Sequence, residues 1–339
     1  MKLGNIKKVI VSILSITTVL SFSGCDLVEK TPEAKEKTVV AKVNKEKITK
    51  GEFDKKYNMQ VGQMEAMSGV KVSENAQMKD YVEKMKPQIL DNMITETVAL
   101  QKANELKVVP EDKELNEEID KKYKETETKL GGTEKFNEFL KSMNVASDYY
   151  KGMIKNSIIF DKLYAKVTSD VVITDTDISN YYHTNIYDFT EKPNKMTVSH
   201  ILCETEDEAK KVADEINKGM KFEDAAKKYS KDPSVAQNNG NLGEVYYSNK
   251  ANPNKYDQDF LNGAINAELN KVTKPIKSSY GFHLILVTKR ETYPAKPIES
   301  VKNDIKTELT QTKKDEKFQS QLKEWKDKSK ITRYEDRLK

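Results

Sequence analysis

Two of the three histidines in the chain lie in apolar stretches typical of β-strands, and they are the first candidates for chemistry. His200 stands in Ser-His-Ile-Leu-Cys at 199–203, and His283 stands in Gly-Phe-His-Leu-Ile at 281–285. An imidazole can donate or accept a hydrogen bond and titrates near neutral pH. Either histidine alone is more simply explained as a hydrogen-bonded core residue. Two of them in strands of one predicted domain are candidate site residues.

Other common catalytic signatures are absent from the sequence. It has no Gly-rich phosphate loop, no paired Cys or His spacing of a metal site and no Gly-x-Ser-x-Gly elbow. We therefore expect no metal and no cofactor. Cys203 near His200 suggests a thiol nucleophile, but strand alternation puts the two side chains on opposite faces. No third group completes such a site, so we interpret Cys203 as a small buried hydrophobe.

The two histidines belong to a segment with the pattern of a compact α+β domain of about 95 residues. Thr205 and Glu208 form a capping box that opens its first helix, and Gly219 marks the end of that helix. The domain is predicted to begin with a strand at 196–203, followed by helices at 205–219 and 222–229. A long Asn- and Gly-rich loop at 232–240, a helix at 257–265 and a strand at 282–288 complete it.

The N-terminal half is predicted to be helical after one short strand at 39–43, with no further strand pattern. Apolar residues recur there at the period of a helix, although this pattern weakens over 59–76. Pro87 is expected in the first turn of a helix or at a kink. The first expected helix begins at Thr49, where Glu52 completes a capping box, and the next two cover 78–107 and 111–129. Further helices are expected to begin at Thr133, at Ser147 and at Thr174, which caps its helix together with Asp177.

The helical period returns after Pro297. Ile298, Val301 and Ile305 share one apolar stripe, which continues toward Trp325. A lone amphipathic helix of this length needs a partner for its apolar face. The N-terminal helical half is the first candidate, and it makes the α+β domain an insertion. A coiled coil with a second copy, giving a homodimer, is the rival use of the stripe.

The N-terminus carries a predicted export signal. A Lys-bearing stretch precedes an apolar run at 9–22, which is short for a bilayer span but suits a signal peptide. Ser-Gly-Cys follows at 23–25, resembling the lipobox of bacterial lipoproteins, with Phe22 where that motif more often has Leu. Lipidation of Cys25 would tether the mature protein to the extracytoplasmic face of the cell membrane. An ordinary signal peptide or a short anchor helix is the alternative.

Composition and charge exclude some function classes. Charged residues make up 33% of the chain and the apolar set 37%, which argues against an integral membrane protein. The net charge is only +4 and the two signs are interspersed, so we expect no nucleic acid partner. With Cys25 acylated, Cys203 is the one remaining thiol, and an internal disulfide is excluded.

Four motifs occur in order within 196–290. They are Ser-His-Ile-Leu at 199–202, Tyr-Ser-Lys-Asp-Pro-Ser at 229–234, Asn-Gly-Asn-Leu-Gly at 239–243 and Ser-Ser-Tyr-Gly-Phe-His at 278–283. This series resembles the successive signatures of parvulin peptidyl-prolyl isomerases. With the lipobox, the opening Val-Asn-Lys-Glu-Lys-Ile-Thr-Lys-Gly-Glu-Phe and the closing helix, the whole chain is similar to PrsA-type foldases. Its helical part resembles the chaperone domain of SurA-like proteins.

The parvulin resemblance implies a role for individual residues. An X–Pro bond loses amide resonance as it rotates, against a barrier of about 18–20 kcal/mol, so an apolar site that favours the twisted amide suffices without a covalent step. Departures from the family pattern are Val245 and Tyr256, near the usual places of an aromatic and a Met, and an insertion at 249–255. The implied catalytic residues are His200, His283, Asp232 and Ser278, and the implied proline-binding residues are Leu242, Tyr256, Phe260 and Ile265.

The expected fold is therefore α+β. A mostly helical chaperone domain carries an inserted parvulin-like domain, whose small antiparallel sheet is flanked by helices. The expected function is a membrane-anchored extracytoplasmic foldase that binds unfolded or newly exported polypeptides and isomerises X–Pro bonds. A chaperone with a weak or inactive parvulin domain and a solute-binding lipoprotein are the alternatives. The expected segments are a signal peptide at 1–24, a tether at 25–38 and the first chaperone part at 39–192. The isomerase domain at 194–291 and the closing helix at 292–339 follow.

Overall fold

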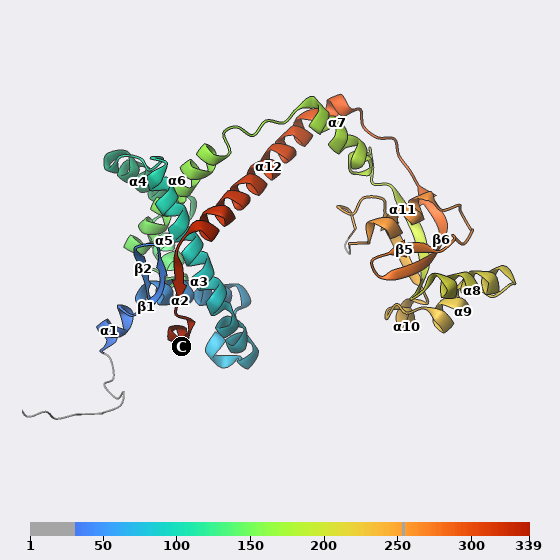
Figure 1. The fold of residues 1–339 in the computed structure, drawn as a ribbon, viewed down its shortest axis with the longest axis horizontal. Helices are drawn as coiled ribbons and strands as arrows, with labels where there is room; N and C mark the ends of the chain where they lie inside the picture. The colour runs from blue at the N-terminus through green and yellow to red at the C-terminus, as the bar shows by residue number, and fades with distance from the viewer. Residues whose placement is uncertain (1–30, 253–254) are drawn as a thin grey trace, which may run out of the picture. The chain divides into compact units, whose positions relative to one another are not determined.

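The computed structural model describes residues 31–252 and 255–339, which form two compact units (Figure 1). The first unit comprises Met1–Lys162 and Glu324–Lys339, and the second comprises Leu163–Lys323. Each unit has its own small antiparallel sheet and its own core, so the expected α+β class is confirmed. Among the described helices, none is long and apolar enough to span a membrane.

The first unit is mainly helical, with a three-stranded sheet of order β2-β1-β7. Val40, Phe53, Leu90 and Ile94 form the centre of its core, where each is fully buried. Its elements are α1 (Pro32–Glu36), β1 (Val39–Val43), β2 (Glu46–Thr49), α2 (Lys50–Ser68), η1 (Val72–Glu74), α3 (Ala76–Glu105), α4 (Asp112–Lys129), α5 (Thr133–Ser142), α6 (Ser147–Val167, shared with the second unit), β7 (Ile331–Arg333) and η3 (Glu335–Leu338).

The expectation of no strand after residue 43 in this half is wrong. Strand β1 turns back at Asn44, whose φ of 56° is tolerated by asparagine, and pairs with β2 as an antiparallel hairpin. Strand β7 pairs with the other edge of β1 from the far end of the chain. Both added strands are short and mostly exposed, so neither shows the apolar alternation by which strands are recognised.

Helices α2 and α3 begin as predicted but extend differently. The capping box of Thr49 and Glu52 opens α2, which continues to Ser68 through the segment where the apolar pattern weakens and ends at Gly69 in a left-handed conformation. Pro87 lies inside α3 and not in its first turn. The next three helices start where Asp112, Thr133 and Ser147 stand.

The second unit contains a four-stranded antiparallel sheet of order β4-β3-β6-β5. Strand β3 is central and pairs along its length with β6. The elements of the second unit are α7 (Asp175–Thr184), η2 (Ile186–Phe189), β3 (Lys195–Cys203), α8 (Glu206–Asn217), α9 (Phe222–Tyr229), α10 (Val235–Asn238), β4 (Asn241–Tyr246), α11 (Gln258–Asn266), β5 (Ile276–Ser278), β6 (Gly281–Glu291) and most of α12 (Ile298–Lys328).

The two faces of this sheet carry separate apolar clusters. Helices α8 and α9 cover one face, where Ile201 and Cys203 pack with Val212 and Phe222. Helix α11 contributes Phe260 to the other face, which continues into His200. Strand alternation thus separates Cys203 from His200 as predicted. Burial raises the pKa of the Cys203 thiol, which suits a packing residue.

Three elements within the predicted isomerase domain at 194–291 were not predicted. The expected loop at 232–240 contains the short helix α10, and the strands β4 and β5 flank the predicted pair. Strand β4 follows directly on the Asn- and Gly-rich loop and contains Gly243, while β5 has only three residues. Such segments resemble loops in sequence, and they become strands here because they pair with β3 and β6.

The apolar stripe of α12 packs inside the chain. Val301 and Ile305 lie against Ile178 and Tyr182 of α7, and Thr174 with Asp177 caps the start of α7 as predicted. Further along α12, Phe318 meets Tyr164 edge to face at a centroid distance of 5.2 Å. This part of the stripe is therefore covered by helices of the same chain.

Gly240→Ala is expected to lower the free energy of unfolding more than Gly243→Ala does. Both glycines have positive φ, 80° and 72°, which costs another residue about 1–2 kcal/mol. A new Cβ at Gly240 would clash, because it would lie 2.6 Å from the carbonyl oxygen of His200. At Gly243 nothing lies within 4 Å of a new Cβ. Denaturant titration of both variants measures the difference, and equal losses would contradict the packing described here.

Candidate active site

Four polar side chains form one hydrogen-bonded row at an end of the second sheet. The Nδ1 atoms of His200 and His283 are 3.2 Å apart. Beyond them, His200 Nε2 lies 2.6 Å from Asp232 Oδ2, and His283 Nε2 lies 2.7 Å from Ser278 Oγ. These four residues come from β3, β6, β5 and the segment between α9 and α10. The structure thus brings together all four residues implied as catalytic.

Asp232, at one end of the row, fixes the direction of every hydrogen bond in it. An ionised Asp232 can only accept, so His200 donates from Nε2 and leaves its Nδ1 as an acceptor. His283 then donates from Nδ1, and its Nε2 accepts from the Ser278 hydroxyl. The hydroxyl oxygen in turn accepts from the backbone N–H of Tyr280 at 3.0 Å. Every polar group in the row is satisfied with both imidazoles neutral.

The electrostatics of the site favour this neutral state. His200 and His283 are only 6% and 5% exposed. Burial, with a smaller effect of neighbouring His200, lowers the pKa of His283 to about 4. Burial also lowers the pKa of His200, against the opposing effect of Asp232. Burial alone would raise the pKa of Asp232, but hydrogen bonds from Ser234 and His200 hold it below its usual range. At neutral pH the row carries one charge, on Asp232.

An apolar pocket of about 300 Å³ lies beside this row, and both histidines line it. Phe260, only 3% exposed, presents its ring edge-on to both, with centroids 5.6 Å from His200 and 5.0 Å from His283. Tyr256 stacks on Phe260 at 5.6 Å. Leu242 of β4 completes the implied apolar lining. The remaining lining residues are Leu202, Asp232, Pro233, Lys255, Asp257 and Tyr280.

Asp257 is a pocket residue that we did not predict. One carboxylate oxygen caps α11 by accepting from the backbone N–H groups of Asp259 and Phe260. The other accepts from both the N–H and the hydroxyl of Ser279, beside the turn that leads to His283. Asp257 therefore fixes the helix of Phe260 against the strand of His283. Its place at the very start of a predicted helix, where Asp is a common cap, was the available signal.

One candidate proline-binding residue belongs neither to the hydrogen-bonded row nor to this pocket. Ile265 is not among the lining residues, and its side chain packs against the neighbouring core cluster. It follows Phe260 by five positions on α11, a rotation of roughly 140° around the helix axis, so it points away from the pocket. Cys25, the expected lipidation residue, lies outside the described residues. Within the described chain, no cluster of His, Cys, Asp or Glu could hold a metal ion.

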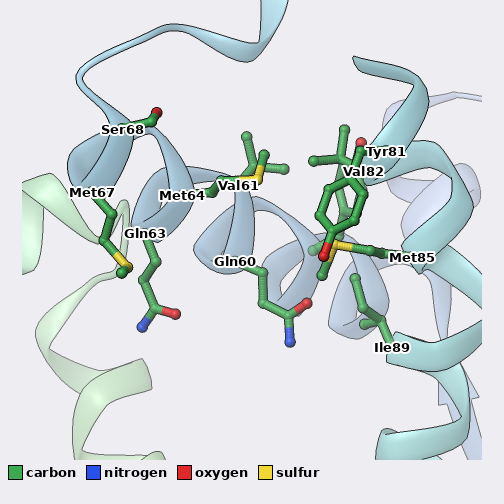
Figure 2. Close-up of a pocket in the computed structure, with 11 residues that line it drawn as sticks. Gln60, Val61, Gln63, Met64, Met67, Ser68, Tyr81, Val82, Met85 and Ile89 are labelled. Carbon is green, nitrogen blue, oxygen red and sulfur yellow. The ribbon is translucent and has the colours of Figure 1, made fainter. Parts of the chain in front are cut away.

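A second apolar hollow, of about 490 Å³, lies between α2 and α3 of the first unit (Figure 2). We call it the methionine groove, because Met64, Met67 and Met85 are part of its lining. Met67 is 90% exposed and Tyr81 is 58% exposed. None of its described lining residues is charged, and Gln60 brings a buried Oε1 atom that has no hydrogen-bond partner. The other lining residues are Tyr57, Val61, Gln63, Ser68, Val82 and Ile89.

Known protein families match both halves of the chain, and known relatives cover almost all of it. Residues 3–164 match the family model of the SurA-like N-terminal domain, and residues 181–291 match that of the PPIC-type PPIASE domain. Over 323 residues the chain is 42% identical to "Foldase protein PrsA" of Clostridium botulinum, covering 94% of this chain and 95% of that protein. The same-named protein of Clostridium kluyveri is 36% identical over 342 residues, covering 98% and 99%.

A solved structure of peptidylprolyl isomerase (PrsA) from Bacillus anthracis is 25% identical in sequence. It covers 70% of this chain and 96% of its own chain, with a TM-score of 0.37.

Phe260→Ala and His283→Ala are each expected to lower kcat/KM for a short proline peptide. Loss of the Phe260 ring removes an apolar contact worth about 1.5–3 kcal/mol, which corresponds to roughly a tenfold to hundredfold loss. His283→Ala leaves His200 Nδ1 without a donor and the O–H of Ser278 without an acceptor. The matched control is His183→Ala, because His183 lies exposed on α7 outside the pocket. Unchanged kcat/KM in both pocket variants would contradict the assignment of this pocket as the active site.

Proposed function

Because the chain belongs to the PrsA family of foldase proteins, we propose a site for each of its two activities. The chain is an extracytoplasmic foldase, and its parvulin domain is a peptidyl-prolyl cis/trans isomerase. We place the isomerase reaction in the pocket of Phe260 and the binding of unfolded clients in the methionine groove. The proposed isomerase domain covers 194–291, between chaperone parts at 39–192 and 292–339.

The single observation that carries the isomerase proposal is the apolar pocket beside the neutral histidine row. A proline ring fits against Phe260, Leu242 and Tyr256, where it is shielded from water. Loss of hydration favours the twisted amide, because the twisted form has less amide dipole to solvate than either planar form. The neutral rings of His200 and His283 present no charge that would stabilise a planar amide. No bond to the protein forms at any stage.

The composition of the methionine groove supports its assignment to clients. Thioether side chains are flexible and polarisable, so one surface can fit many apolar side chains. The unpaired Oε1 of Gln60 is an acceptor for a backbone N–H, a group that every unfolded chain offers at each non-proline residue. The partner is therefore an extended polypeptide rich in apolar residues. Two exposed members, Met67 and Tyr81, allow entry from solvent.

A lipid on Cys25 is the proposed anchor. The apolar run at 9–22 and the small residues at 23–24 support it, as does the polar stretch that follows at 26–38. Labelled palmitate is expected to enter the full-length protein in cells and to be lost in Cys25→Ser. Cys203→Ser is the matched control, since this buried thiol should not affect labelling. Equal label in the wild type and Cys25→Ser would exclude the anchor.

Met67→Glu and Tyr81→Glu are expected to weaken the suppression of client aggregation by roughly tenfold when combined. A carboxylate in the groove must lose hydration against apolar client side chains, which is costly. Both residues are largely exposed, so the fold should be kept. Light scattering of an unfolded client at several protein concentrations measures the effect.

The control for these groove variants is Leu106→Glu. Leu106 is 42% exposed at the C-terminal cap of α3 and lies outside the groove lining. Activity on a short proline peptide should be unchanged in all of these variants. Full aggregation suppression by the double variant would place client binding elsewhere.

A further inference from the structure

We propose that Lys250 and Asn249 are positioning residues for the proline pocket, holding the chain segment that carries Tyr256 in place. They lie in the stretch between β4 and α11, where the sequence departs from the usual parvulin pattern. The inference rests on the proposed isomerase site, and it adds residues that do not themselves line the pocket. The mechanism described above does not use either of them.

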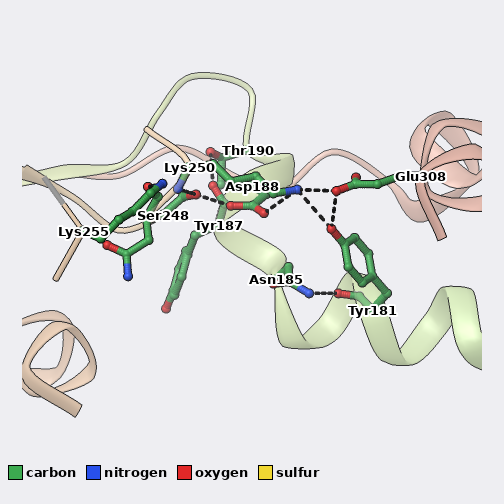
Figure 3. A network of polar contacts seen from close by, with 10 residues as sticks. Tyr181, Asn185, Tyr187, Asp188, Thr190, Ser248, Lys250, Lys255 and Glu308 are labelled. Carbon is green, nitrogen blue, oxygen red and sulfur yellow. Dashed lines mark hydrogen bonds and ion pairs between the residues drawn. The ribbon is translucent and has the colours of Figure 1, made fainter. Parts of the chain in front are cut away.

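Lys250 joins three elements of the second unit at one point (Figure 3). Its ammonium nitrogen lies 2.9 Å from Glu308 Oε1 on α12 and 3.2 Å from Asp188 Oδ2 on η2. It also donates to the Tyr181 hydroxyl of α7 at 3.0 Å, and that hydroxyl donates to Glu308 Oε1 at 2.7 Å. The ion pair is thus part of a closed polar network, which we call the Lys250 clamp.

The Lys250 clamp differs from an ordinary surface ion pair at Asp188 only, because the Lys250 and Glu308 side chains are 54% and 46% exposed. Exposed pairs contribute little because water competes for both charges. Here the Asp188 side chain is only 12% exposed, and its other oxygen accepts from the Ser248 hydroxyl. Burial alone would lower the pKa of Lys250, but hydrogen bonds to Tyr181, Glu308 and Asp188 raise it, so the ammonium stays charged at neutral pH. The clamp is therefore intact under assay conditions.

Asn249 transmits this anchoring to the pocket wall. Its side-chain oxygen accepts from the backbone N–H of Tyr256 at 3.1 Å, and its side-chain nitrogen donates to the carbonyl of Tyr256 at 2.9 Å. One amide side chain thereby satisfies both backbone groups of Tyr256. Asn252, 5% exposed, holds both backbone groups of Tyr246 in the same way. Asparagine side chains thus hold the backbones of Tyr246 and Tyr256.

The line of contact continues from Tyr256 to the histidine row. Tyr256 stacks on Phe260, and Phe260 meets His200 and His283 edge to face. Helices α7 and α12 thus support the aromatic wall against which proline would rest. Release of the clamp frees this wall without touching the row of hydrogen bonds. Since the wall contacts bound substrate in every state, its loosening should weaken binding and raise KM more than it lowers kcat.

The test uses the full chain and a proline peptide, with kcat and KM determined separately. Lys250→Met keeps the length of the side chain and removes its charge, and it should raise KM roughly threefold to tenfold with kcat within about twofold. Asn249→Ala should have the same effect. Lys250→Arg should restore most of the loss, because a guanidinium can reach the same carboxylates. The matched control is Lys210→Met, which removes one exposed i,i+4 pair on α8.

A double-mutant cycle connects the effect to the network itself. If Lys250 acts through Glu308, then Lys250→Met and Glu308→Gln together should raise KM less than the product of the two single effects. An unchanged KM in Lys250→Met overturns the proposal. So does a fall in melting temperature with no change in KM, which indicates a stabilising role only. If Phe260→Ala also leaves catalysis unchanged, the pocket assignment fails, and this result is separate from a failure of the clamp.

Discussion

The row of hydrogen bonds from Asp232 to Ser278 is the constraint around which the second unit is arranged. Two imidazoles lie about 95% buried there, and an unpaired buried polar group costs about 1–3 kcal/mol. The two rings have four nitrogens, and each of the four has a partner. With both rings neutral, this requires an acceptor at one end and a donor at the other. A carboxylate and a hydroxyl meet that need.

Backbone groups of the sheet and its loops also form hydrogen bonds with residues of the row, including those at its two ends. Asp232 accepts from the backbone N–H of Ser234, and Ser278 accepts from that of Tyr280. The backbone of His200 donates to the carbonyl of Gly240 at 2.8 Å, an approach close enough that a Cβ at Gly240 would collide with β3. Asp232 and Ser278 are thus each held by a backbone N–H two positions further along the chain, and His200 is held by the backbone of Gly240. Because these polar groups are satisfied within the row, the aromatic side chains beside them can remain apolar.

Local signals were enough for much of this architecture. The capping boxes at Thr49, Thr174 and Thr205 were predicted, because such a box depends only on residues three positions apart. Strands β2, β4, β5 and β7 were missed because pairing with another strand, and not their own pattern, makes them strands. Within the site, the two histidines were singled out by their apolar strand contexts, whereas their paired role and Phe260 were found by resemblance. The contacts of Asp257 with Ser279 and of Lys250 with Glu308 join residues 22 and 58 positions apart, and no local spacing reveals them.

The contrast between the two proposed binding surfaces follows from the reaction itself. Rotation of an X–Pro bond swings the flanking chain through a large arc, so a site that held both flanks firmly would stabilise one planar isomer and slow exchange. Firm contact is useful only around the proline ring, where stacked aromatic side chains such as Tyr256 and Phe260 give a fixed shape. The rest of the client must be retained by contacts that tolerate movement. Methionine side chains such as Met64 and Met67 meet that requirement, since they change rotamer at little cost and suit many partners. A foldase that must both keep a client and let it rotate therefore benefits from two surfaces of opposite stiffness.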